Sequence, residues 1–82
     1  MATIDPGWTA LLEEVDAALR DARRLAAERP VGTADHATAA SLVTRLPEFE
    51  RDVRLAIRRG RTNTAAYRSV FEQLVTSLRA IA

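Results

Sequence analysis

Arginines gather in one short segment, residues 51–61, which holds five of them around a single leucine. On a helix, the first three of these arginines lie within about 60° of one another, and the fourth flanks them. Leu55 falls inside this basic face, about 160° from the middle of the apolar stripe of the same helix. A leucine with a rim of arginines is typical of a small protein-binding patch, with an apolar anchor and a charged edge. The candidate partner-binding residues are Arg51, Arg54, Leu55, Arg58, Arg59 and Arg61.

The same arginines also fit a second function, because arginines at helical spacing can neutralise phosphates. Nucleic-acid binding is therefore the alternative hypothesis. The net charge of only +1 and the acidic residues Glu48 and Glu50 nearby speak against it. No aromatic residue stands among the arginines to stack on bases. A solvated charged face with one surface leucine is also common in proteins, so three interpretations of the segment stay open.

Residues for catalysis or metal binding are few. The chain has one histidine, His36, and no cysteine, and the Glu-x-x-His pairs of helical di-metal sites do not occur. The serines do not stand in a Gly-x-Ser-x-Gly turn, and the three glycines are too far apart to form a phosphate-binding loop. We therefore expect a protein that is not an enzyme and that uses no metal or cofactor. A non-catalytic subunit of an enzyme complex is a further alternative.

Three amphipathic segments must position these residues. The first is predicted over residues 6–28, because Asp5 is a favoured N-cap, Pro6 suits the first helical position and Pro30 disfavours helix just before it. The last is predicted over 64–81, with Asn63 or Thr64 as its cap. In each, the apolar side chains cover an arc of about 140°.

The middle helix is predicted over residues 33–59. Thr33 is a good N-cap, and two arginines followed by Gly60 are a typical stop signal. Pro47 interrupts the series, so it either kinks one long helix or separates two shorter ones. The apolar stripe keeps its phase from Leu42 through Val53, which favours the kinked helix.

These elements predict one all-α domain over residues 1–82, a small antiparallel three-helix bundle with a long Pro47-kinked middle helix. A four-helix bundle broken at Pro47 is the alternative. The chain has 82 residues, 48% of them hydrophobic, so it can bury a hydrophobic core. In a chain this short, such a core supplies only a few kcal/mol of net stability. Trp8 and Tyr67 are expected in the core or at its edge. The middle helix is longer than the last, so part of it stays uncovered, which favours a homodimer.

The composition also bears on location. Residues 1–5 lack the basic stretch and apolar run of a signal peptide, and no apolar run approaches the roughly 18 residues of a membrane span. We expect a cytoplasmic protein that does not enter a membrane. All 12 basic residues are arginine, a bias that fits a GC-rich bacterial coding sequence. The expected function is a small interaction or regulatory module that binds another protein, itself or both.

Overall fold

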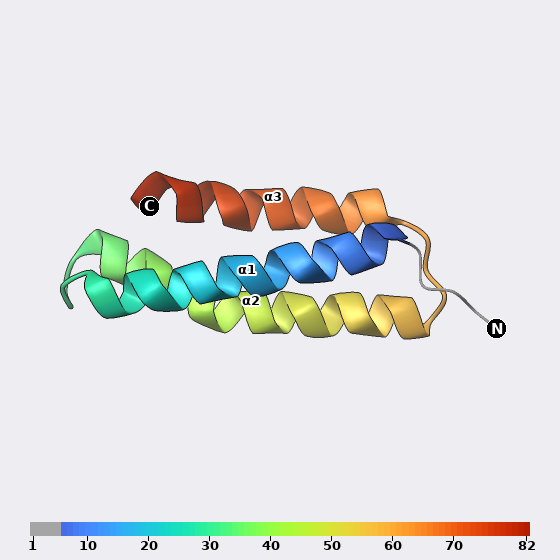
Figure 1. The fold of residues 1–82 in the computed structure, drawn as a ribbon, viewed down its shortest axis with the longest axis horizontal. Coiled ribbons are helices and arrows are strands. Elements are labelled where there is room, and N and C mark those ends of the chain that lie inside the picture. The colour runs from blue at the N-terminus through green and yellow to red at the C-terminus, as the bar shows by residue number, and fades with distance from the viewer. Residues whose placement is uncertain (1–5) are drawn as a thin grey trace.

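Three helices make up the computed structural model, which describes residues 6–82. They are α1 (Pro6–Glu28), α2 (Ala34–Arg58) and α3 (Thr64–Ile81), and residues 6–82 contain no strand. Figure 1 shows them running along one long axis, with the two connections at opposite ends of a body 48 Å long. The predicted antiparallel three-helix bundle is confirmed, with every helix end within one residue of its predicted place. The proposed cap Asp5 lies outside the described residues.

Helix α2 runs through Pro47 without a break, so the four-helix alternative is wrong. The proline has no N–H, and the carbonyl of Val43 therefore loses its helical partner, at a cost of about 3 kcal/mol. Leu46, Phe49 and Val53 lie on both sides of the proline and are at most 6% exposed. Burial of each such side chain contributes about 1.5–3 kcal/mol, so the continuous stripe outweighs the lost hydrogen bond.

Both ends of α2 are closed by hydrogen bonds. At its start, the side-chain oxygen of Thr33 accepts a hydrogen bond from the backbone N–H of His36 at 3.2 Å, which confirms the predicted N-cap. At its end, Gly60 takes a left-handed φ of +69° and its N–H donates to the carbonyl of Ile57 at 3.1 Å. The N–H of Arg61 donates to the carbonyl of Ala56 at 3.0 Å, which completes a Schellman motif.

All four aromatic residues meet in one cluster that joins the three helices. The Trp8 and Tyr67 rings meet edge to face with centroids 5.4 Å apart, and Phe49 stacks on Phe71 at 6.0 Å. Trp8 is 2% exposed, as predicted for a core residue, while Tyr67 is half-buried at the core edge. The indole Nε1 of Trp8 also donates a hydrogen bond of 3.2 Å to the carbonyl of Arg61.

Helix α3 is the least covered of the three. Only Phe71, Leu78 and Ile81 are buried on it, whereas α1 buries seven residues. Asn63 stands at its N-cap position, but its side chain makes no capping hydrogen bond, so the predicted cap is wrong in this respect. The backbone of Asn63, with φ −84° and ψ 52°, is not in the extended conformation that aims an N-cap side chain at the first turn.

At the opposite end of the bundle, Arg29 ties the first connection to the end of α3. Its guanidinium donates a 2.7 Å hydrogen bond to the carbonyl of Ile81, and its Nε lies 3.6 Å from a carboxylate oxygen of Asp35. Arg29 thereby satisfies a carbonyl in the last turn of α3 and forms an ion pair with Asp35 in the first turn of α2.

Candidate protein-interaction surfaces

Leu55 lies one turn before the end of α2 and is 42% exposed. Within residues 6–82, the other exposed large hydrophobic side chains are Val31 and Val70. The side chain points away from the bundle because Val53 and Ala56, on either side of it in sequence, occupy the core face of the helix. Leu55 is therefore an apolar surface group and not part of the core.

The arginines around Leu55 lie on two sides of it. Toward α3, a pocket of about 250 Å³ is lined by Asp52, Leu55, Ala56, Arg59, Arg61 and Tyr67. Toward α1, a shallower hollow of about 190 Å³ is lined by Leu12, Arg54, Ile57 and Arg58. Arg51 is exposed and lines neither hollow. We call Leu55 together with the five arginines of residues 51–61 the Leu55 patch.

The five arginines differ in their charge partners. Arg54 makes an ion pair with Glu50 one turn earlier, with Nη2 to Oε1 at 2.9 Å. Among the described residues, Arg51, Arg58, Arg59 and Arg61 have no carboxylate within ion-pair distance. The Leu55 patch thus presents four unpaired guanidinium groups, with Asp52 as the carboxylate in its pocket. The i,i+4 spacing of Glu50 and Arg54 is a signal that could have identified their pairing from the sequence.

Three residues that line this pocket, Asp52, Ala56 and Tyr67, are not among the predicted partner-binding residues. Tyr67 reaches the pocket because residues 59–63 turn the chain back and place the start of α3 at the same end of the bundle as the end of α2 (Figure 1). The hydrogen bond from Trp8 to the carbonyl of Arg61 anchors this connection to α1. The backbone around Arg59 and Arg61 is therefore held by hydrogen bonds, while their side chains are exposed.

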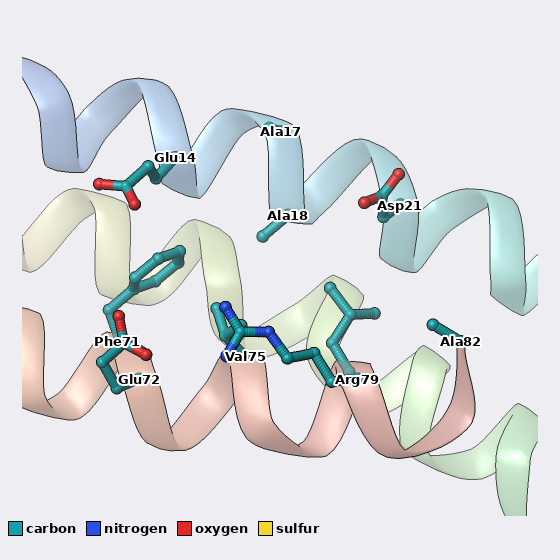
Figure 2. Close-up of a pocket in the computed structure, with 10 residues that line it drawn as sticks. Glu14, Ala17, Ala18, Asp21, Phe71, Glu72, Val75, Arg79 and Ala82 are labelled. Carbon is teal, nitrogen blue, oxygen red and sulfur yellow. The ribbon is translucent and has the colours of Figure 1, made fainter.

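A third hollow, not foreseen from the sequence, lies between α1 and α3 (Figure 2). Its volume is about 290 Å³. Ala17 and Ala18 line it on the α1 side, and Figure 2 shows Ala18 pointing toward α3. Side chains this short do not fill the space between the two helices. We call this hollow the α1–α3 groove; it is lined by Glu14, Ala17, Ala18, Asp21, Phe71, Glu72, Val75, Leu78, Arg79 and Ala82.

The edges of the α1–α3 groove are mainly acidic, with three carboxylates against one guanidinium. The Nη2 of Arg68 donates a hydrogen bond to Oε2 of Glu14 at 2.8 Å. This hydrogen bond raises the pKa of Arg68 above its ordinary value. Asp21 lies 3.8 Å from Arg24, and Glu72 has no ion-pair partner among residues 6–82. Figure 2 shows Glu14 and Asp21 on the α1 edge and Arg79 extended along α3 toward Val75.

Other kinds of site have less support in the described part of the chain. His36 is half-buried in the first turn of α2, and no three His, Asp or Glu side chains within residues 6–82 come together as metal ligands would. No described helix combines the length and the apolar character that a membrane crossing requires.

No protein-family model matches the chain, and no curated protein or solved structure shows a significant similarity to it.

Proposed function

We propose that the chain is a small cytoplasmic interaction module that binds a partner protein through the Leu55 patch and carries out no catalysis. The observation that supports this proposal is the exposure of Leu55, 42%, beside a pocket lined by unpaired arginines. Interface hot spots are enriched in arginine and lie where a partner excludes water, and an exposed leucine adds buried apolar area when a partner covers it. The proposed partner offers an apolar recess for Leu55 and carboxylates for the surrounding guanidinium groups.

The patch is suited to binding because it requires little rearrangement. The Schellman motif at Gly60 and the Trp8 hydrogen bond already order the backbone that carries Arg59 and Arg61. A preordered backbone lowers the entropy lost on association, so more of the contact energy remains as affinity. Arg51, Arg58 and Arg59 have no ion pair within residues 6–82 that must be broken before they contact a partner.

The test is affinity capture from extracts of the source cells with three tagged proteins: the wild type, Leu55→Asp and Val70→Asp. Val70 is a matched control, because it is 47% exposed on α3 and lies outside the Leu55 patch. We expect a protein that wild type and Val70→Asp capture and that Leu55→Asp does not. With the purified partner, Leu55→Asp should weaken binding at least tenfold, since a carboxylate replaces the apolar anchor.

Circular dichroism of the Leu55→Asp protein is the control for folding. An unchanged helical spectrum and an unchanged partner affinity would contradict the proposal, because the leucine would then contribute nothing to binding. If the spectrum instead shows unfolding, Leu55→Gln keeps the test valid without introducing a charge.

Nucleic-acid binding is the second candidate, supported by the four unpaired arginines at positions 51, 58, 59 and 61. Phosphate contacts predict an affinity for short DNA or RNA duplexes that falls steeply between about 50 and 200 mM salt. Arg58→Ala should then weaken binding while Leu55→Ala leaves it nearly unchanged. Protein docking predicts the larger effect for Leu55, so the two substitutions distinguish the two functions.

A further inference from the structure

The Leu55 patch and the α1–α3 groove have complementary chemistry on one chain. The Leu55 patch is an exposed leucine among arginines, and the groove is an apolar hollow with acidic edges. We propose that the partner is a second copy of this chain, whose Leu55 patch docks into the α1–α3 groove of the first. This inference rests on the proposed function, because it uses the same patch and names what the patch binds.

The groove has room for the leucine. Its volume of about 290 Å³ is far above the roughly 10–15 Å³ that a cavity needs to hold one water molecule. Phe71 and Leu78 form its buried lining, and the apolar surface still open to water includes the exposed Ala17 and the half-buried Val75. A leucine that enters such a hollow displaces water from apolar surface on both molecules, and burial of this surface favours association.

The charges favour contact between unlike surfaces. Two Leu55 patches placed against each other would bring unpaired arginines together, and two grooves would bring carboxylates together. The patch–groove contact instead places guanidinium groups such as Arg58 and Arg59 near Asp21 and Glu72. Like charges across an interface cost free energy and opposite charges lower it, so the heterologous contact is preferred.

The two surfaces lie on separate parts of the molecule, because the lining of the groove shares no residue with that of the two hollows around Leu55. One copy can therefore use both at once. If two copies insert their patches into each other's grooves, the result is a closed dimer; otherwise, the contact repeats from copy to copy. The stoichiometry of the assembly separates these two arrangements.

The test uses two variants that each lose one surface. Leu55→Asp removes the patch, and the double variant Asp21→Arg/Glu72→Arg reverses the charge of the groove. Sedimentation velocity of the wild type should show a mass that rises with concentration above the 9.0 kDa of one chain. Each variant alone should remain a monomer, and an equimolar mixture should form a 1:1 heterodimer from the one intact patch and the one intact groove.

Two controls keep the result interpretable. Val70→Asp, at an exposed position outside both surfaces, should self-associate like the wild type. If the double variant fails to fold, Ala17→Leu fills the groove from an exposed helical position and should also lower self-association at least tenfold. Raising the salt to 0.5 M should weaken the wild-type contact, because part of it is electrostatic.

Several results would overturn the inference. Patch–groove docking is excluded if the wild type stays monomeric at millimolar concentration. It is also excluded if the groove variant still self-associates, or if the mixture of the two variants forms no heterodimer. If a monomeric wild type still captures another protein in a Leu55-dependent way, the proposed function stands and only the identity of the partner is wrong. If Leu55→Asp changes neither self-association nor capture, both proposals fail.

Discussion

The two ends of the bundle use arginine in opposite ways. At the end that holds the first connection, Arg29 contacts the carbonyl of Ile81 and the carboxylate of Asp35, and its side chain is only 33% exposed. At the other end, four arginines have no carboxylate partner among residues 6–82, and the bundle is closed by Trp8 and its aromatic neighbours. Arginine stabilises the fold at the first end, whereas at the second it is exposed and unpaired within residues 6–82.

The difference follows from what each end leaves unsatisfied. The last carbonyls of α3 have no helical partner, and a guanidinium fork is well suited to reach one of them and a carboxylate together. At the Leu55 end, the Schellman hydrogen bonds satisfy the last carbonyls of α2 from the backbone itself. The arginines there are not needed to satisfy the backbone at the end of the helix. Arg29 is therefore a structural residue, and the arginines of the Leu55 patch are candidates for a functional role.

The aromatic cluster gives the largest expected effect and tests whether the Leu55 end is closed without arginine. Phe49→Ala removes a ring that is 6% exposed and packs against both Tyr67 and Phe71. We expect the free energy of unfolding to fall by about 3–5 kcal/mol, measured by urea denaturation followed by circular dichroism. Val31→Ala, at a residue 86% exposed in the first connection, is the control and should change it by less than about 0.5 kcal/mol. A loss below about 1 kcal/mol for Phe49→Ala would mean that the rings do not pack closely.

Arg29→Gln tests the structural role of arginine at the opposite end. The substitution removes the hydrogen bond to the Ile81 carbonyl and the ion pair with Asp35. We expect a loss of about 1–2 kcal/mol in unfolding free energy, because a hydrogen bond from a charged group is stronger than a neutral one but this side chain is partly exposed to solvent. Faster amide hydrogen exchange in the last turn of α3 would locate the effect. Arg29→Lys should recover only part of the loss, since an ammonium lacks the fork; full recovery would show that charge alone matters.

The N-caps of α2 and α3 provide a smaller contrast between the same two ends. Thr33→Ala should cost about 1 kcal/mol, because its side chain accepts the hydrogen bond from the N–H of His36. Asn63→Ala should cost only a few tenths of a kcal/mol, since Asn63 makes no such bond at the start of α3. Parallel thermal unfolding of both variants measures the difference. Equal losses would contradict it and would show that Asn63 caps α3 in solution.

The fold could be predicted from the sequence because local signals agree along the whole chain. Pro30 and Gly60 mark the ends of the first two helices, and the phase of the apolar stripe across Pro47 identified one helix where the proline alone left two alternatives. The N-cap position of α3 at Asn63 could be predicted, but the absence of its capping hydrogen bond could not, because this bond depends on the backbone dihedral angles as well as on the residue type. The dihedral angles of Asn63 are set by the path of residues 59–63 across the end of the bundle.

The candidate surfaces could be predicted only in part. The exposure of Leu55 follows from one helical wheel, because the core face of α2 is broad and regular. The pocket beside it needs Tyr67 from another helix, and the α1–α3 groove needs the short Ala17 and Ala18 of α1 where α3 packs nearby. A wheel shows which face of a helix is apolar but not which neighbour covers it, so hollows between helices are properties of the assembled bundle.

Arg59→Gln gives the smallest expected change in stability and completes the comparison with Arg29→Gln. Arg59 stands at the C-cap of α2, where a cation gains a few tenths of a kcal/mol from the helix dipole. Its removal also relieves repulsion from the neighbouring arginines Arg58 and Arg61, an effect of similar size and opposite sign. The unfolding free energy should therefore change by less than about 0.5 kcal/mol, and 0.5 M salt should shrink even this change because both effects are exposed to solvent. Urea denaturation of both variants in one buffer measures the contrast. A loss at Arg59 as large as that at Arg29 would mean that the arginines of the Leu55 patch help to close their end of the bundle and are not reserved for a partner.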